Sequence, residues 1–346
     1  GCRPPNPPSG LCRVLRRLSG PGAGRQTLHR ACAVCCGGFR GRLPAAKPSI
    51  GGVGVAKYGG VVLTDGDLDL LRAHRFASRS ASIEHWENWL LTDCTQRAPM
   101  PDGALHPIAM FHLPLAAAGV TIGELFTLGG AAPEPGAVTL LGYDWQFVTP
   151  LREGRPYTGG GGVGAVERVT GSDSTVLYDD VDFVFELADD SGSVVDTASH
   201  HWRFRRSAAP HPAEAFEQHV PVAIPPLEVV ADGARMKTMA AILRDPYAIH
   251  WDPEAARSAG QGGRTVNQGP LNVGYIANML MAWAGPEAVR RLSVRFHGRV
   301  FDCDRLVAGG GLLAGSSTDC AVWLDRIEPS GATTRVLSGT ATLAQP

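Results

Sequence analysis

The pattern of hydrophobic and polar positions divides the chain into two stretches that share one order of elements. Each begins with apolar residues at helical spacing and continues with β-branched and aromatic residues that alternate as strands do. The first stretch predicts helices at 66–97 and 108–126, then strands at 138–148, 163–170, 174–187 and 193–205. The second predicts helices at 238–243, 253–259 and 270–284, then strands at 291–296, 305–316, 320–327 and 334–343.

The two stretches can be overlaid at a separation of about 150 residues, which is typical of an internal repeat. An aromatic strand, a polar turn and a Gly-rich strand occur at 143–164 and again at 293–311. The helix predicted at 270–284 is apolar around nearly its whole circumference, so other elements must surround it. An antiparallel sheet curled around such a helix is the economical solution. The pattern therefore predicts an α+β fold made of two such units.

A proline-rich segment separates the two units. Residues 207–226 contain five prolines, and few contacts are expected to cross such a segment. We therefore predict an N-terminal unit at 66–206, a linker at 207–230 and a C-terminal unit at 231–346.

Residues 1–55 form an extension rich in Arg and Cys. The first 64 residues contain no Asp or Glu and hold five of the eight cysteines. A transit peptide is one interpretation, because such peptides are Arg-rich and acid-poor. A misplaced start or an added extension is the other, because Pro and Gly interrupt any amphipathic helix. In either case we expect this segment to be disordered or non-native. The cluster Cys32, Cys35 and Cys36 lacks the second ligand pair of a zinc site.

Composition and charge narrow the class of protein. A formal net charge of −1 gives no electrostatic reason to expect nucleic acid or an anionic membrane as a partner. Residues 103–123 and 265–286 carry no charged side chain and are long enough to span a membrane. Both contain prolines and polar residues, so we predict buried core helices of a soluble protein instead. The scattered cysteines Cys94, Cys303 and Cys320 indicate a reduced, cytoplasmic location.

Several familiar motifs are excluded by their context. The run Gly159–Gly164 contains G-x-G-x-x-G, but a predicted strand follows it where a dinucleotide site needs a helix. The chain has no nucleophile elbow and no phosphate-binding P-loop. The pairs His200–His201 and His106/His112 lack a partner at metal-ligand spacing. We therefore expect neither a metal nor a cofactor.

The segment 244–252 carries the candidate chemistry. Asp245 and His250 lie five residues apart, and Pro246 disfavours helix at Asp245. A bend can direct both side chains at one point, whereas a straight helix would turn them ~140° apart. A carboxylate and an imidazole that converge can hold a water and move protons near neutral pH. Taken alone, the segment is better explained by a helix cap and a surface histidine.

The start of the predicted helix 270–284 strengthens the case for a site. Pro270 suits a first helical position, and amides at a helix start carry partial positive charge. Gly269 has no side chain, so a ligand carbonyl could approach its N–H closely. Donors of this kind stabilise an enolate oxygen, and losing one typically costs ~2.7–4 kcal/mol of barrier. An acid/base pair with such a donor is what water addition to an α,β-unsaturated thioester requires.

At these residues the sequence resembles the MaoC-like (R)-specific enoyl-CoA hydratases and hydroxyacyl dehydratases of double hot-dog fold. Their motif, roughly D-x-N-P-I-H-x-D, stands here as Asp245-Pro-Tyr-Ala-Ile-His-Trp-Asp252, and their glycine is Gly269. The resemblance implies that Asp245 and His250 activate water and shuttle the α-proton. It also implies that the Gly269 N–H binds the thioester carbonyl.

Three positions depart from the family. Tyr247 replaces the usual Asn, Ala248 the usual Pro, and Gln268 the usual His before the glycine. These changes affect pocket shape and substrate, and we place Tyr247, Asn267 and Gln268 among the substrate-binding residues. The resemblance also implies two repeats, each an antiparallel sheet wrapped around a long central helix. The N-terminal repeat is then a degenerate copy that helps to enclose the acyl chain.

The predicted function is reversible hydration of an enoyl thioester of CoA or an acyl-carrier protein, by a lyase of fatty acid and lipid metabolism. A non-catalytic thioester-binding subunit and a hot-dog thioesterase are the alternatives. The protein is expected to be a monomeric double hot-dog or a homodimer. Arg257, Arg264 and Arg299 are candidates for binding the CoA phosphates, although each is better explained as a solvated surface charge.

Overall fold

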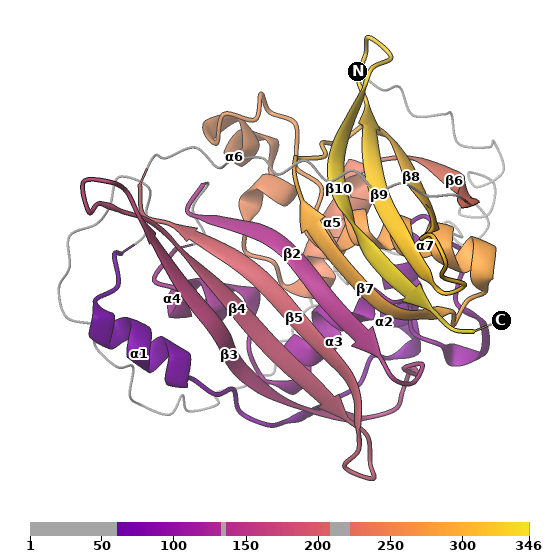
Figure 1. The fold of residues 1–346 in the computed structure, drawn as a ribbon, viewed down its shortest axis with the longest axis horizontal. Coiled ribbons are helices and arrows are strands. Elements are labelled where there is room, and N and C mark those ends of the chain that lie inside the picture. The colour runs from indigo at the N-terminus through magenta and orange to yellow at the C-terminus, as the bar shows by residue number, and fades with distance from the viewer. Residues whose placement is uncertain (1–60, 133–135, 208–221, 346) are drawn as a thin grey trace, which may run out of the picture. The chain divides into compact units, whose positions relative to one another are not determined.

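An antiparallel sheet of ten strands runs through the residues that the computed structural model describes, 61–132, 136–207 and 222–345 (Figure 1). The extension predicted at 1–55, with its cysteine cluster, lies outside these ranges. The strands are β1 (Ser80–Ala81), β2 (Val138–Phe147), β3 (Tyr157–Thr170), β4 (Val176–Ala188), β5 (Val194–Arg205), β6 (Val222–Val230), β7 (Val289–Phe296), β8 (Arg305–Leu312), β9 (Asp319–Ile327) and β10 (Thr333–Leu343). Their order across the sheet is β1-β3-β4-β5-β2-β7-β10-β9-β8-β6.

This order consists of two equivalent halves. Counted outward from the centre, β2-β5-β4-β3-β1 on one side corresponds to β7-β10-β9-β8-β6 on the other. The halves meet where β2 and β7 pair antiparallel, from Gly142 opposite Arg295 to Gln146 opposite Arg291. The prediction of two repeated units is therefore confirmed. A single hydrophobic core cluster extends across both halves.

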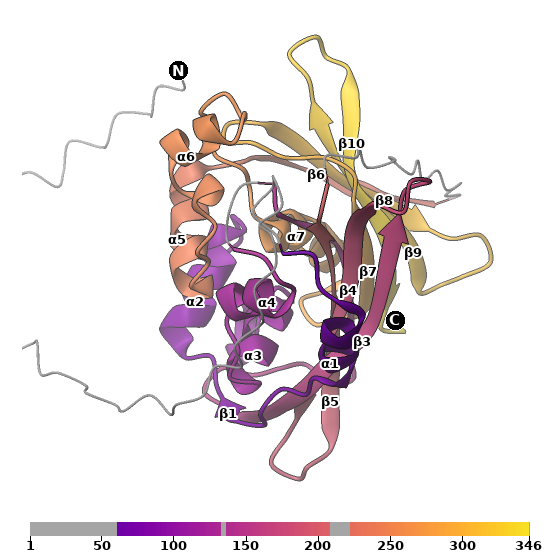
Figure 2. The same cartoon turned by 90° about the vertical axis from the view of Figure 1, so that its left-hand side faces the viewer.

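The helices gather mainly on one side of the sheet, as Figure 2 shows for α2 to α7. They are α1 (Asp65–Ala73), α2 (His85–Cys94), α3 (Ala109–Ala117), α4 (Ile122–Leu128), α5 (Gly233–Leu243), α6 (Pro253–Ser258) and α7 (Gly269–Ala284). Every residue of α7 from Pro270 to Met281 is buried, and the helix contacts strands β6 to β9. The helix predicted at 270–284 thus has the surrounded position that its sequence required.

Both charge-free segments contain buried helices, α3 and α7. Among the described residues, no single helix has the length and apolar character needed to cross a membrane. The pair α3 and α4, bent by 70°, passes that test together, by length and composition only.

Two of the predicted helices are interrupted. The stretch 66–97 leaves helix after Ala73, passes through β1, which pairs with β3, and resumes helix in α2. The stretch 108–126 breaks at Gly119, whose φ of 65° ends α3 before α4 begins. In the first case long-range strand pairing overrides the local helical pattern, and in the second a left-handed glycine ends the helix.

The linker predicted at 207–230 is wrong for residues 222–230, which form β6 and pair with β8. Pro225 and Pro226 sit at the edge of the sheet, where the register shifts between Ile224 and Leu227. A proline at an edge or bulge removes no ladder hydrogen bond, so the proline pair does not prevent a strand. Residues 208–221 lie outside the described ranges.

The run Gly159–Gly164 lies inside β3, which confirms a strand rather than a nucleotide-binding loop and extends it to Tyr157. A Cβ placed on Gly159 would come 2.4 Å from the Cβ of Ala117 in α3. The glycine therefore lets the strand approach the helix closely.

Candidate active site

A bend between α5 and α6 carries the candidate acid/base pair. Helix α5 ends at Arg244, which adopts a left-handed conformation with a φ of 50°. After Pro246 the chain makes a short 3₁₀ turn, Ala248–His250, and the Asp252 side chain then caps the start of α6. The segment is thus a bend, as Pro246 predicted, and not a continuous helix.

Asp245 and His250 converge within this bend. The Asp245 Oδ2 lies 3.7 Å from the His250 Nε2, and the two side chains are only 7% and 14% exposed. The Asp245 Oδ1 accepts a hydrogen bond of 2.9 Å from the Tyr247 amide. A separation of 3.7 Å exceeds a direct hydrogen bond, so both atoms can still bind a third partner.

The Val266 carbonyl determines which ring nitrogen of His250 carries the hydrogen in the neutral ring. The Nδ1 lies 2.7 Å from the Val266 carbonyl oxygen, which can only accept, so Nδ1 carries the proton. In the neutral ring the Nε2 that faces Asp245 therefore holds a lone pair. This is the arrangement that a general base needs, with its orientation fixed from behind.

The spacing alone would not have identified the pair. D-x-x-x-x-H also occurs at Asp69–His74 and at Asp196–His201. Asp69 forms an ion pair with Arg72 on the exposed face of α1. The His201 Nδ1 lies 2.6 Å from an oxygen of Asp182. It is the bend after α5 that brings the partners at 245 and 250 together.

The same bend is attached to the start of α7. The Val266 amide donates a 2.9 Å hydrogen bond to the Ile249 carbonyl, while the Val266 carbonyl accepts from His250. Three residues later Gly269 begins α7, and the first amides of a helix have no acceptor within it. The structure therefore brings the predicted pair and the predicted amide donor into one region.

The absence of a side chain at Gly269 has a packing reason that the sequence did not show. A Cβ there would lie 2.5 Å from the Leu140 Cδ2 and 3.1 Å from both the Phe296 Cζ and the Tyr143 hydroxyl oxygen. Leu140 and Tyr143 belong to β2, and Phe296 belongs to β7. The glycine is required because the seam between the two half-sheets presses against the first turn of α7.

The three predicted substrate-binding residues occupy different places. The half-buried Tyr247 packs its ring edge-to-face on His250, and its hydroxyl accepts a 2.8 Å hydrogen bond from the Gly136 amide. The buried Gln268 donates to the Met236 carbonyl and the buried Asn267 to the Asn272 side chain, at 2.8 and 2.7 Å. Tyr247 thus lies beside the pair, whereas Asn267 and Gln268 hold the segment before α7 in place.

The three arginines proposed for CoA phosphates differ in their pairing. Arg257 forms an ion pair with Glu254, and Arg264 with Asp304. Arg299 donates to the Gln261 side-chain oxygen at 3.3 Å. Because two of the three charges are neutralised by carboxylates, these residues do not form a free basic patch. Within the described ranges no group of three or more His, Cys, Asp or Glu residues is arranged to hold a metal ion.

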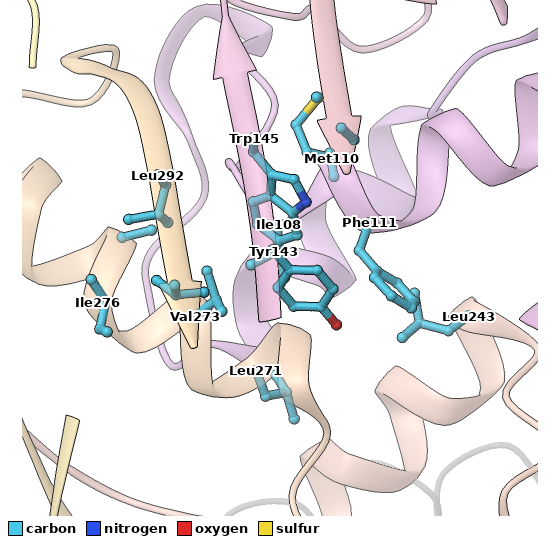
Figure 3. Packing of buried hydrophobic residues seen from close by; sticks show 14 of the residues in the cluster. Ile108, Met110, Phe111, Tyr143, Trp145, Leu243, Leu271, Val273, Ile276 and Leu292 are labelled. Carbon is cyan, nitrogen blue, oxygen red and sulfur yellow. The ribbon is translucent and has the colours of Figure 1, made fainter. Parts of the chain in front are cut away.

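Tyr143 was not singled out from the sequence, yet its hydroxyl lies beside this region. The side chain is 0% exposed, and its hydroxyl has no hydrogen-bond partner among the described residues. Figure 3 shows the ring on β2 with its oxygen pointing toward the start of α7, where Leu271 lies. Sequence patterns mark Tyr143 only as an aromatic strand residue, because its neighbours at the site come from distant parts of the chain.

An antiparallel sheet around a buried helix, present twice and joined edge to edge, is the double hot-dog fold. No protein-family model and no curated protein matches the sequence. Solved structures do match it. The chain is similar to a MaoC-like dehydratase from Phytophthora capsici, at 13% identity and a TM-score of 0.59, over 80% of this chain and 98% of that one.

A second MaoC-like dehydratase matches at 16% identity and a TM-score of 0.56, over 80% of this chain and 99% of that one. The full-length peroxisomal multifunctional enzyme type 2 of Drosophila melanogaster matches at 15% identity and a TM-score of 0.59. That match covers 78% of this chain and 48% of the enzyme, so the chain spans about half of its length. The likeness shows that this α+β chain shares the fold of the MaoC-like dehydratases, as predicted.

Proposed function

We propose that the protein is a hydro-lyase that interconverts an enoyl thioester and a 3-hydroxyacyl thioester, carried by CoA or an acyl-carrier protein. The observation that carries this proposal is the convergence of Asp245 and His250 at 3.7 Å, in a bend attached to the segment that opens α7. The shared fold with MaoC-like dehydratases supports it.

Each step of the reaction has a residue suited to it. The His250 Nε2 takes a proton from a water molecule, and the water oxygen bonds to C3 of the enoyl group. The C2=C3 electron pair moves toward the carbonyl, so an enolate oxygen forms, which the Gly269 N–H stabilises. C2 then gains a proton from the acid/base pair. The buried Asp245 carboxylate stabilises the imidazolium that forms beside it.

A panel of enoyl-CoA thioesters tests this proposal, with loss of the conjugated absorbance and a gain of one water by mass spectrometry as readouts. Asp245→Asn and His250→Ala are each expected to lower the rate about 10²-fold or more. The matched control is Asp69→Asn, since Asp69 has the same spacing to a histidine but lies exposed on α1. Unchanged turnover in both active-site variants would contradict the assignment of Asp245 and His250. No turnover of any thioester in the panel would contradict the proposed function.

Two alternatives remain as outcomes of the same experiment. Release of free CoA, detected with a thiol reagent, identifies a thioesterase. Binding without product identifies a non-catalytic thioester-binding subunit, which the departures at Tyr247, Ala248 and Gln268 favour. A cytoplasmic location and the monomeric or homodimeric state stay predictions.

A further inference from the structure

Tyr143 carries a buried polar atom that forms no hydrogen bond with any described residue. Its ring is enclosed by aromatic neighbours, with centroids 5.7 Å from Phe111, 5.1 Å from His200 and 5.6 Å from Phe296. Its hydroxyl is buried without a hydrogen-bond partner among the residues described. A buried hydroxyl without a partner costs free energy, so one that persists calls for an explanation such as a ligand.

The position of the hydroxyl indicates which ligand atom it would meet. It lies 3.1 Å from the point that a Cβ on Gly269 would occupy. In a helix both the N–H bond and the Cα–Cβ bond tilt toward the N-terminus. The Tyr143 hydroxyl therefore lies beside the residue that opens α7, whose amide has no acceptor within the helix.

We propose that Tyr143 is a catalytic residue of this site, whose hydroxyl donates a second hydrogen bond to the thioester carbonyl oxygen beside the Gly269 N–H. The proposal rests on the hydro-lyase function proposed above. No proton leaves the tyrosine in the reaction: the hydrogen bond shortens as negative charge develops on the carbonyl oxygen, and it lengthens again when C2 is protonated. Two donors on one oxygen are the usual composition of an oxyanion hole.

The electrostatic surroundings keep the hydroxyl in the form that can donate. Burial, and then the negative charge of Asp245, raise the pKa of Tyr143 well above its ordinary value. The phenol therefore stays protonated throughout the neutral range. The Asp245 carboxylate is therefore near enough for its charge to act on the Tyr143 hydroxyl.

Tyr143→Phe tests this role because it removes one oxygen atom from an otherwise unchanged ring. We expect kcat to fall about 10²-fold or more, with a much smaller change in KM, since the bond strengthens in the transition state. The unfolding midpoint should stay the same or rise, because no hydrogen bond within the protein is lost.

Tyr157→Phe is the matched control and should show the opposite result. Tyr157 is also a buried tyrosine on a strand of the N-terminal half, but its hydroxyl accepts a 2.9 Å hydrogen bond from the Arg152 amide. Its loss should lower the unfolding midpoint and leave kcat unchanged. A Tyr143→Phe variant with native kcat, in a protein whose activity Asp245→Asn abolishes, would overturn the role of Tyr143 and leave the proposed function intact.

A second measurement does not depend on turnover. Infrared spectra of bound saturated acyl-CoA thioesters, isotope-labelled at the carbonyl, report the hydrogen bonds on that oxygen. We expect the carbonyl frequency to be lower in the native protein than in Tyr143→Phe, with Tyr157→Phe like the native protein. Identical frequencies in the native protein and Tyr143→Phe would contradict the proposal even if no enoyl substrate is turned over.

Discussion

Replacing Gly269 by alanine tests whether packing against β2 and β7, the two strands at the centre of the sheet, explains the glycine at the start of α7. Alanine is the better helix former by up to ~1 kcal/mol, so helix propensity alone predicts that the variant is more stable. The geometry predicts the reverse. The new Cβ would lie 2.5 Å from the Leu140 Cδ2, about 1 Å or more inside the usual carbon–carbon contact of about 3.5–4.0 Å.

The magnitude follows from these opposing effects. Overpacking by one methyl group typically costs ~1–3 kcal/mol, and propensity returns up to ~1 kcal/mol, so a net loss of about 1–2 kcal/mol is expected. Urea unfolding measures this loss as a lower midpoint at unchanged slope. The rate of the proposed hydration should also fall, because the first amide of α7 moves.

Leu140→Ala provides the matched test. The side chain that obstructs the new Cβ is then absent, so adding Gly269→Ala to Leu140→Ala should cost less than adding it to the native chain. A coupling of at least ~0.5 kcal/mol is expected for residues in contact. Strictly additive effects, or a Gly269→Ala variant more stable than the native chain, would refute the packing explanation for this glycine.

Two further predictions concern the buried charges of the N-terminal half. Asp179→Asn should lower the free energy of unfolding by about 3–5 kcal/mol, because Asp179 and Arg206 are both 0% exposed and form an ion pair. Asp65→Asn, at the exposed partner of Arg168, should leave the urea midpoint unchanged. Burial raises the pKa of Asp196 to about 8, so the folded chain keeps a proton that the unfolded chain releases near pH 4. Stability from this group is therefore lost as the pH rises from about 4 to 8. Asp196→Asn should gain stability relative to the native chain across that window in paired unfolding curves, and a pH-independent difference would contradict the assignment.

The C-terminal half could be predicted almost completely because its signals are local. The strong apolar pattern placed a helix at 270–284 where α7 runs from Gly269 to Ala284, and a strand at 320–327 where β9 begins one residue earlier. The bend at Asp245 followed from Pro246 in the same way. Features of this kind depend on residues next to each other in the chain.

The errors arose where distant residues decide the outcome. The proline pair in β6 looked like linker because the sequence does not show that this strand lies at the sheet edge. The break after Ala73 depends on pairing with β3, far along the chain. The reason for Gly269 lies in side chains of β2 and β7, so the sequence identified the residue but not its packing constraint.

The topology explains why a degenerate repeat would still contribute to a site in the other one. Strand β2 corresponds to β7 in the repeat, and the two pair at the centre of the sheet. Each half therefore presents its central strand to the same helix start: Phe296 comes from β7, and Leu140 and Tyr143 come from β2. In a C-terminal half alone Leu140 and Tyr143 would be absent, and of the three atoms that crowd a Cβ on Gly269 only the Phe296 Cζ, at 3.1 Å, would remain. The first amide of α7 is therefore surrounded by side chains from both β2 and β7, and neither repeat alone provides this environment.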